Sequence, residues 1–138
     1  MKKKYTQQEI DNLIIILDNK RYNKNVSFEN CDLSELNLSE IIFNDCSFRF
    51  ANLSQTNLSK ANMRWSDLSH ANLSYANLTS TDLFAVAVND ANFLGANLAR
   101  ANLEQGDFSK ANLAGVNLAG ANLDNTQLPT SQINDDII

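Results

Sequence analysis

Residues 51–75 read ANLSQ-TNLSK-ANMRW-SDLSH-ANLSY, five successive segments of five residues built on one plan. Each segment has a small residue first, Asn or Asp second and an apolar residue third. This pattern continues in both directions along the chain. It places an apolar residue at every fifth position from Phe28 to Leu128, which is twenty-one positions with no interruption. A repeat of this regularity predicts a solenoid in which each segment is one structural unit.

The spacing within a segment indicates how the chain runs. The first and third residues lie two positions apart, so an extended backbone turns both side chains to the same side. A period of five fits neither a helix nor a continuous strand, and we therefore expect a short extended piece followed by a turn. Asn or Asp occupies the second position in sixteen segments, where its side chain can bond nearby backbone groups and align in ladders. Because the chain has only four Gly and one Pro, the turns are not expected to be built on those residues.

Segments such as Ala51-Asn-Leu-Ser-Gln55 and Ala111-Asn-Leu-Ala-Gly115 resemble the pentapeptide-repeat family. The resemblance implies an all-β fold: a right-handed quadrilateral β-helix with four segments per coil, in which residues twenty apart stack on one another. The expected repeat domain covers residues 25–130. Its segments make about 5.25 coils, and at a strand spacing of ~4.8 Å the rod is ~25 Å long.

The residues before the repeat predict an N-terminal capping α-helix. Thr6 and Glu9 have the spacing of a capping box, and apolar residues then fall on one face of a helix from about Gln7 to Lys20. We expect residues 1–24 to form a tail and this helix, which lies across the first coil and hides its unpaired edge. The three lysines at positions 2–4 are expected to be a solvated tail.

At the carboxyl end, Pro129 breaks the repeat, and residues 131–138 are expected to form a turn or a tail. An open coil end favours a homodimer through the C-terminal coil, with a short cap as the alternative.

Composition restricts the function classes. A net charge of -5 and a pI near 4.7 disfavour direct binding to nucleic acid, which needs clustered Lys and Arg. The apolar run from Leu13 to Leu17 is too short for a signal sequence or a membrane span, so we expect a cytoplasmic protein that binds no membrane.

Cys31 and Cys46 are expected to be buried free thiols. His70 is the only histidine and has an outward position, so we expect no metal site, no cofactor and no enzyme activity.

Large side chains at outward positions form the candidate site. Stacking at twenty-residue intervals places Arg64 and Trp65 below Phe84 and its neighbour, so that the two rings would be exposed together. Aromatic rings with an Arg are typical of binding hot spots, and we assign Arg64, Trp65 and Phe84 to partner binding. The adjoining segment has Ala87 in place of Asn or Asp. The alternatives are decay of the repeat and rings that only cover neighbouring coils.

Three functions follow from these observations. The resembled family includes Qnr-type fluoroquinolone-resistance proteins, which imitate duplex DNA and engage DNA gyrase, so the resemblance implies gyrase or another topoisomerase as one partner. Residues 25–130 carry eleven acidic and five basic side chains, whereas ~25 Å of duplex carries ~15 negative charges. We therefore favour a non-catalytic scaffold or regulator that binds some other protein. A purely structural module is the third hypothesis.

Overall fold

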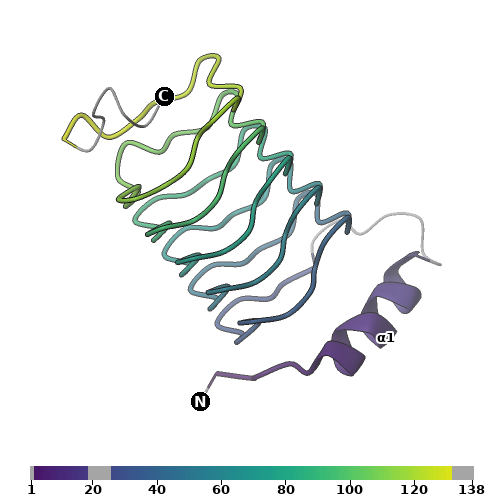
Figure 1. The fold of residues 1–138 in the computed structure, drawn as a ribbon. Coiled ribbons are helices and arrows are strands. Elements are labelled where there is room, and N and C mark those ends of the chain that lie inside the picture. Colours follow the sequence, from purple (N-terminus) through teal and green to yellow (C-terminus); the bar gives the residue numbers. More distant parts are fainter. Residues whose placement is uncertain (1, 19–25, 132–138) are drawn as a thin grey trace.

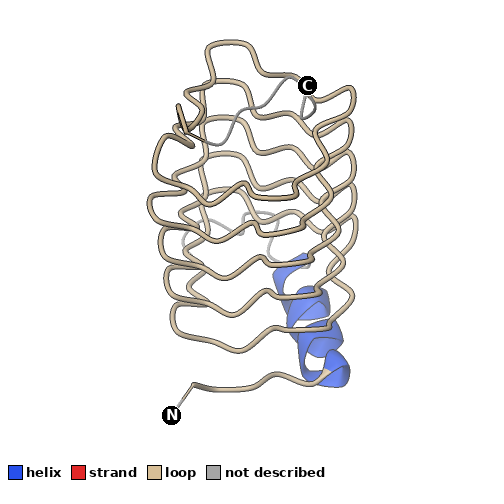
Figure 2. Ribbon diagram, turned by 60° about the vertical axis from the view of Figure 1, so that its left-hand side comes forward, coloured by secondary structure: helices blue, strands red, loops and turns tan. Residues whose placement is uncertain are grey.

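The computed structural model describes residues 2–18 and 26–131 and winds the second range into a stack of four-sided coils, with one helix at the end of the stack (Figure 1). Seventeen parallel bridges join residues twenty apart, from Ser27–Ser47 to Asp107–Gln127. Each coil therefore contains four segments, as the family resemblance implies. The coils lie in register, one above the other (Figure 2).

The β structure consists of single bridges. Within the described residues, the second position of each segment from 26 to 130 is paired, and the fourth and fifth positions form a turn in every segment up to residue 125, so no strand extends beyond one residue. The expected all-β fold thus has parallel pairing along the stack but very short extended pieces. The physical reason is that a turn interrupts the backbone every five residues.

The turns bring the backbone into the left-handed region mostly without glycine. Sixteen non-glycine residues at the fifth position have φ between 52° and 63°, and three of the four glycines share that position. This conformation costs a non-glycine residue about 1–2 kcal/mol. Hydrogen bonds between coils offset the cost: the N–H of Gln55 donates to the carbonyl of Ser74 at 2.9 Å, and other corners repeat this bond.

The side chains at the second position support the turns and form the predicted ladders. Oδ1 of Asn52 accepts a hydrogen bond from the N–H of Ser54 at 3.2 Å, two residues along the chain. The Nδ2 groups of Asn72, Asn92 and Asn112 each donate to the Asn one coil earlier, at 3.4, 3.3 and 2.9 Å. Each amide therefore links a turn to the neighbouring coil.

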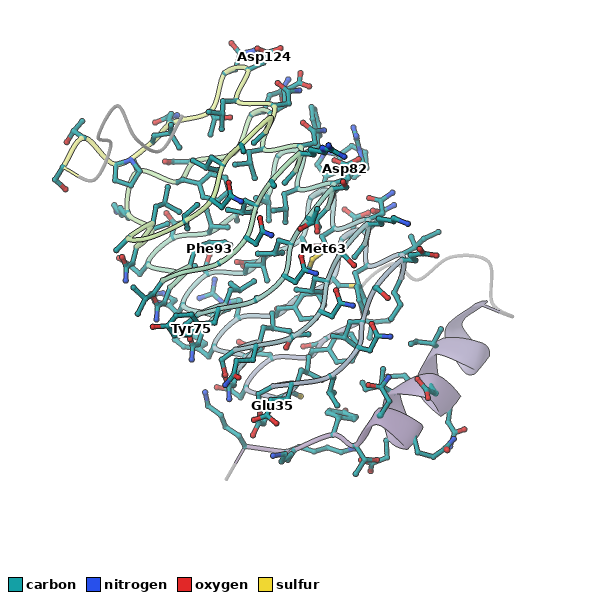
Figure 3. All side chains as sticks on the ribbon, in the orientation of Figure 1. Glu35, Met63, Tyr75, Asp82, Phe93 and Asp124 are labelled. Carbon is teal, nitrogen blue, oxygen red and sulfur yellow. The ribbon has the colours of Figure 1, made fainter. Side chains whose placement is uncertain are left out.

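The third-position side chains fill the interior in stacked columns, as predicted. Phe28 and Phe48 lie twenty residues apart and stack with ring centroids separated by 5.1 Å. Met63 and Phe93 are fully buried inside the coil, whereas Tyr75 points outward from a corner (Figure 3). The core is thus one continuous cluster along the stack.

The first position of most segments also points inward and takes a small side chain, with Leu36 and Ile41 among the larger exceptions. Cys31 and Cys46 lie there as buried thiols that form no disulfide, as expected. Burial raises the pKa of Cys46 to about 11. The buried hydroxyls of Thr56 and Thr81 each donate to a backbone carbonyl of the preceding coil at 2.8 Å, which satisfies their hydrogen-bonding groups.

Helix α1 (Gln7–Asp18) lies across the first coil (Figure 1). The capping box is formed, because the Thr6 N–H donates to Glu9 Oε2 at 2.8 Å and the Glu9 N–H donates to Thr6 Oγ1 at 3.2 Å. Ile10 is buried against the core. The Gln7 side chain donates to the carbonyl of Asn37 at 2.9 Å and accepts from its N–H at 2.8 Å. The side chain therefore supplies the two bonds that a preceding coil would have made.

The residues before α1 correct one prediction. Positions 2–4 were expected to be a solvated tail, but Lys4 forms a parallel bridge with Asp32. The Asp32 N–H donates to the Lys3 carbonyl at 2.7 Å, and the Tyr5 N–H donates to the Asp32 carbonyl at 3.0 Å. The unpaired edge of the first coil offers these backbone groups, and pairing satisfies them. The lysine side chains themselves are exposed.

Two sequence predictions fall on residues that the structure does not describe. The predicted end of the helix at Lys20 and the link from it to the first coil belong to residues 19–25. The turn or tail predicted for 131–138 lies, beyond residue 131, outside the described ranges.

Candidate functional site

The candidate site stands on one corner of the coil. Arg64 and Trp65 are the fourth and fifth residues of their segment, and Trp65 has the left-handed φ of 58°. Asn62 Oδ1 accepts from the Arg64 N–H at 3.3 Å, while the Trp65 N–H donates to the Phe84 carbonyl at 3.0 Å. The repeat itself therefore fixes the backbone from which these side chains leave.

The structure brings the three predicted side chains together. The Arg64 Cζ lies 4.2 Å from the centroid of the Phe84 ring and 4.9 Å from that of Trp65. The two rings meet edge to face, with centroids 6.0 Å apart and planes at 83°. Trp65 is 52% exposed, but Phe84 is partly buried. The two rings therefore lie together at the surface, but Phe84 is less exposed than Trp65 because the Arg64 guanidinium lies over its ring.

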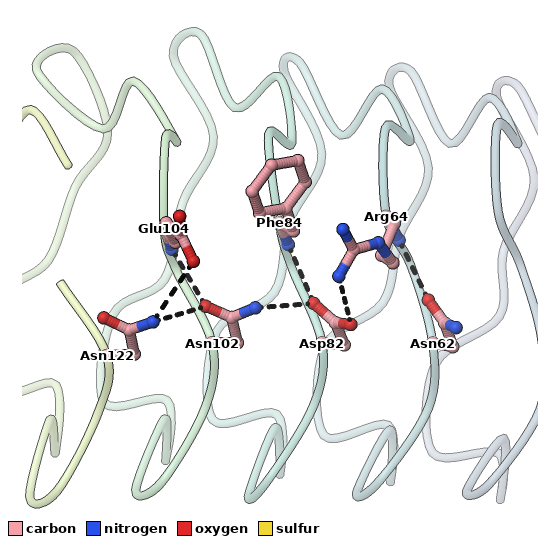
Figure 4. A network of polar contacts seen from close by, with 7 residues as sticks. All are labelled: Asn62, Arg64, Asp82, Phe84, Asn102, Glu104 and Asn122. Atoms are coloured by element: carbon pink, nitrogen blue, oxygen red, sulfur yellow. Dashed lines mark hydrogen bonds and ion pairs between the residues drawn. The ribbon is translucent and has the colours of Figure 1, made fainter. Parts of the chain in front are cut away.

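An acid holds the guanidinium in place. Arg64 Nη1 lies 3.0 Å from Asp82 Oδ2. Asp82 Oδ1 accepts from the Phe84 N–H at 3.1 Å and from Asn102 Nδ2 at 3.0 Å, which joins the ion pair to the polar ladder of this face (Figure 4). The ladder continues through Asn122. Arg64 is thus ordered before any partner arrives.

Two acidic residues, Asp45 and Glu104, lie on the same corner as the cluster. The Asp45 N–H donates to the Arg64 carbonyl at 3.0 Å from the coil below. Glu104 stands one coil above Phe84 and accepts from Asn122 Nδ2 at 3.4 Å (Figure 4). The cluster therefore has acidic side chains on both sides along the stack.

A second cluster, which the sequence reasoning missed, occupies another corner. Phe50 and His70 stack with centroids 4.7 Å apart and planes at 4°. Arg49 Cζ lies 5.5 Å from the Phe50 centroid, and its Nη1 lies 3.0 Å from Asp67 Oδ2. His70 Nδ1 is 3.9 Å from Asp90 Oδ2. The sequence contains a pattern that indicates this cluster, because Arg49-Phe50 repeats the order of Arg64-Trp65 and His70 follows Phe50 by twenty residues.

The electrostatics of Asp67 reflect this arrangement. Burial by itself raises the pKa of the carboxyl, but hydrogen bonds from Ser69 and from Arg49, together with the Arg49 charge, outweigh it and hold the pKa below its ordinary value. Asp67 is therefore ionised at neutral pH and remains paired with Arg49.

Other chemistry has little support in the described residues. No group of three or more His, Cys, Asp or Glu there could hold a metal ion. No described helix is long and apolar enough to cross a membrane. An open hollow of about 310 Å³ lies between the N-terminal residues and α1 and is lined by Lys3, Tyr5, Glu9, Asn12 and Leu13.

Comparison with known families agrees with the geometry. A model of the pentapeptide repeat region matches residues 23–92, just over half of the chain, and a model of eight pentapeptide repeat copies matches residues 89–128. The chain belongs to the pentapeptide repeat family. Among curated proteins, this pentapeptide repeat protein has no significant sequence match.

Solved structures of pentapeptide repeat proteins share the fold. Rfr23 from the cyanobacterium Cyanothece 51142 is 23% identical, with a TM-score of 0.63 over 86% of this chain and 99% of that one. A pentapeptide repeat protein from the Arabidopsis thaliana thylakoid lumen is 26% identical, with a TM-score of 0.55 over 59% of this chain and 63% of that one. A trypsin-treated variant of QnrB1, a plasmid-mediated fluoroquinolone resistance protein, is 21% identical, with a TM-score of 0.57 over 90% and 69%.

Proposed function

We propose that this pentapeptide repeat protein is a non-catalytic, cytoplasmic module that binds another protein, and that its contact site includes Arg64, Trp65 and Phe84. The observation that carries the proposal is a cluster of large side chains at corner positions where the fold requires none. Elsewhere in the same repeat, Ala114-Gly115 and Ala119-Gly120 occupy the same two positions. A large exposed ring that folding does not need is available for a partner.

The cluster has the physical properties of a binding hot spot. Trp and Arg are enriched among residues whose truncation costs ~2 kcal/mol or more of binding free energy. Asp82 and the Phe84 ring already hold the Arg64 guanidinium, so binding orders it further at little entropic cost. Trp65 leaves about half of its surface open for contact.

The substitution Trp65→Ser tests the proposal, with Tyr75→Ser as the matched control. Both rings are exposed at fifth positions with φ of 58°, and Ser80 shows that serine accepts that position and φ. We expect both variants to keep the unfolding free energy within ~0.5 kcal/mol. Trp65→Ser alone should weaken capture of a specific protein from host lysate and raise the dissociation constant measured with the purified partner.

The structural alternative makes the opposite prediction. If Trp65 only covers the coil, Trp65→Ser lowers the melting temperature and leaves every captured protein unchanged. Equal losses of binding in Trp65→Ser and Tyr75→Ser would also contradict a site at Arg64, Trp65 and Phe84.

Imitation of DNA toward a topoisomerase is the second candidate function. Its support is the acidic repeat region, net -6, on a fold shared with QnrB1. Ion pairs leave this net charge unchanged but place a base beside three of the eleven acids, since Lys60 lies 3.2 Å from Glu40 and the two arginines described above each pair with an Asp. A supercoiling assay with purified gyrase tests it: a mimic protects or inhibits the enzyme at low salt and loses the effect as salt rises. No effect at low salt removes this function.

We also propose that the coil is right-handed. A separate proposal is that two copies of the chain associate through the C-terminal coil. In the last described segments, Leu123 and Leu128 are only partly buried, so a second copy would cover apolar surface there. Analytical ultracentrifugation over a range of concentrations tests the dimer, and a monomer at every concentration contradicts it.

A further inference from the structure

The two arginine clusters are built on one motif. Arg49-Phe50 and Arg64-Trp65 each place an arginine before an aromatic residue at the same two positions of a segment, and no other segment in 26–131 does so. Each arginine pairs, at 3.0 Å, with an Asp eighteen residues further along the chain. The next coil then adds a second ring, His70 on Phe50 and Phe84 on Arg64.

Both clusters border the same face of the coil. This face consists of three stacked segments, 46–50, 66–70 and 86–90, which we call the framed face. Trp65 immediately precedes the second segment, and Phe84 lies two residues before the third. Phe50 and His70 end the first and second segments on the other side. One edge of the framed face is therefore formed by the Trp65 cluster and the opposite edge by the Phe50 cluster.

The centre of the framed face is formed by Ser47, Asp67 and Ala87, which bridges join from coil to coil. Asp67 holds the Arg49 guanidinium there, with Nη1 3.0 Å from its Oδ2. Ala87 stands where most segments have Asn or Asp, so the third segment has no amide or carboxylate there. Trp65, at 52% exposure, and Phe50, at 39%, flank this centre. A partner segment that crosses the face can contact both rings.

The framed face is acidic despite its two arginines. Arg49 and Arg64 each pair with an Asp, Arg49 Nε also lies 3.8 Å from Glu29 Oε1, and Lys2 Nζ donates to the Phe50 carbonyl at 2.9 Å. The five carboxylates of Glu29, Asp45, Asp67, Asp82 and Asp90 outnumber these three cations by two. The side chain of Asp90 is 60% exposed and that of Glu29 is 45% exposed. A phosphate backbone would be repelled, whereas a cation would be attracted both to the acids and to the faces of the rings.

We propose that the framed face binds a basic segment of a partner protein, which places Lys or Arg side chains against Phe50 and Trp65 and between the surrounding carboxylates. This inference rests on the proposed function, because it assigns the chemistry of the partner for the same site. It extends the site to a second corner, through Phe50, and it requires that charge and aromatic contact act together.

Short fluorescent peptides test the charge requirement. Three peptides share the same apolar residues and carry Lys, Ser or Glu at the remaining positions, and fluorescence anisotropy measures their binding to the full chain. We expect the Lys peptide to bind at least about tenfold more tightly than the other two and to lose affinity as salt rises. Equal binding of all three peptides, or preference for the Glu peptide, overturns the inference.

Variants locate the binding on the framed face. Phe50→Ser, Trp65→Ser and Asp90→Asn should each weaken the Lys peptide several-fold, with the melting temperature measured alongside. The controls Tyr75→Ser and Glu35→Gln remove an exposed ring and an exposed acid from another corner and should leave the affinity unchanged. If Glu35→Gln weakens binding as much as Asp90→Asn, the peptide senses only overall charge and the inference fails.

The same variants separate this inference from the proposed function. If Trp65→Ser loses a protein captured from lysate while Phe50→Ser retains it, the Trp65 site stands and the extension over the framed face fails. If neither substitution changes the captured proteins or the peptide affinity, both proposals fail.

Discussion

Residues 46–85 and residues 91–120 are built on the same core but differ at their corners. The first region places Phe50, Trp65, Tyr75 and Phe84 at outward corner positions, whereas the second has no aromatic side chain there. Both regions keep buried columns of apolar residues, and the same bridges at twenty-residue intervals join their coils. The comparison shows that the interior and the ladders are enough to form the coil. The aromatic corners of the first region therefore call for another explanation, and the proposed binding of a partner is the one that we favour.

The largest expected effect tests whether the two regions share one core. Leu78 and Leu98 lie in the same column and are fully buried. Replacing either by Lys should unfold the domain, because an unpaired buried charge costs several kcal/mol against a total stability of roughly 5–15 kcal/mol. Circular dichroism and thermal melting measure the loss, and Ser80→Lys at an exposed corner is the control. A folded Leu98→Lys protein would show that the second region depends less on its core.

The next effect concerns helix α1, which covers the first coil. Within the described residues, no helix covers the other end of the stack. Gln7→Ala removes both hydrogen bonds to the backbone of Asn37 and should cost about 1 kcal/mol, since water replaces part of what is lost at this exposed site. Gln8→Ala is the matched control, because Gln8 bonds only within α1. Chemical denaturation measures both variants, and an equal loss in the control would mean that α1 itself was weakened.

A transplant of the motif sharpens the comparison further. The double substitution Ala99→Arg, Arg100→Trp puts the arginine–aromatic pair on a corner of the second region without changing the net charge. Position 100 already has a φ of 60° with a non-glycine residue, so stability should change by no more than ~0.5 kcal/mol. The residue eighteen further on is Asn117, so the transplanted arginine has an acid partner only when Asn117→Asp is added. The transplant lacks the second corner ring and the carboxylates of the framed face, so it should not bind the Lys peptide with or without Asn117→Asp. Strong binding of either transplant would show that one arginine–aromatic pair is enough and that the framed face as a whole is not needed.

The smallest effect is a dependence on pH that both regions should share. Hydrogen bonds from the Ser two residues on help to lower the pKa of Asp67 in the first region and of Asp107 in the second. When folding lowers the pKa of a carboxyl group, that group stabilises the folded protein at pH values above its ordinary pKa. The stabilisation is lost as the pH falls through the lowered pKa of the folded state. In the variants Asp67→Asn and Asp107→Asn, the melting temperature should fall less steeply between about pH 5 and pH 3 than in the unsubstituted protein. An equally steep fall would show that these two carboxyl groups do not cause the pH dependence.

The sequence predicted the interior well because position in the segment determines burial. The period of five identified the buried third positions and the mostly small first positions, and the family resemblance added the stacking at twenty-residue intervals that forms the columns. The spacing of Thr6 and Glu9 predicted the start of α1. The pairing of Lys4 with Asp32 was missed, because one short segment has no periodicity and joins an edge far along the chain. The stack of His70 on Phe50 was missed because His70 was considered only as a possible catalytic or metal-binding group. The partial burial of Phe84 depends on how Arg64 folds over it, which spacing alone does not determine.

The Gln7 side chain has a consequence for growth of the stack. Its side-chain amide bonds to the backbone N–H and carbonyl of Asn37, as a peptide group of a preceding coil would. Because the amide ends a side chain, it presents no further backbone groups with which another coil could pair. A chain that arrives at this end to extend the coil finds those two groups of Asn37 taken. The side chain thus acts as a terminator, and it opposes head-to-tail polymerisation of the rod into a fibre.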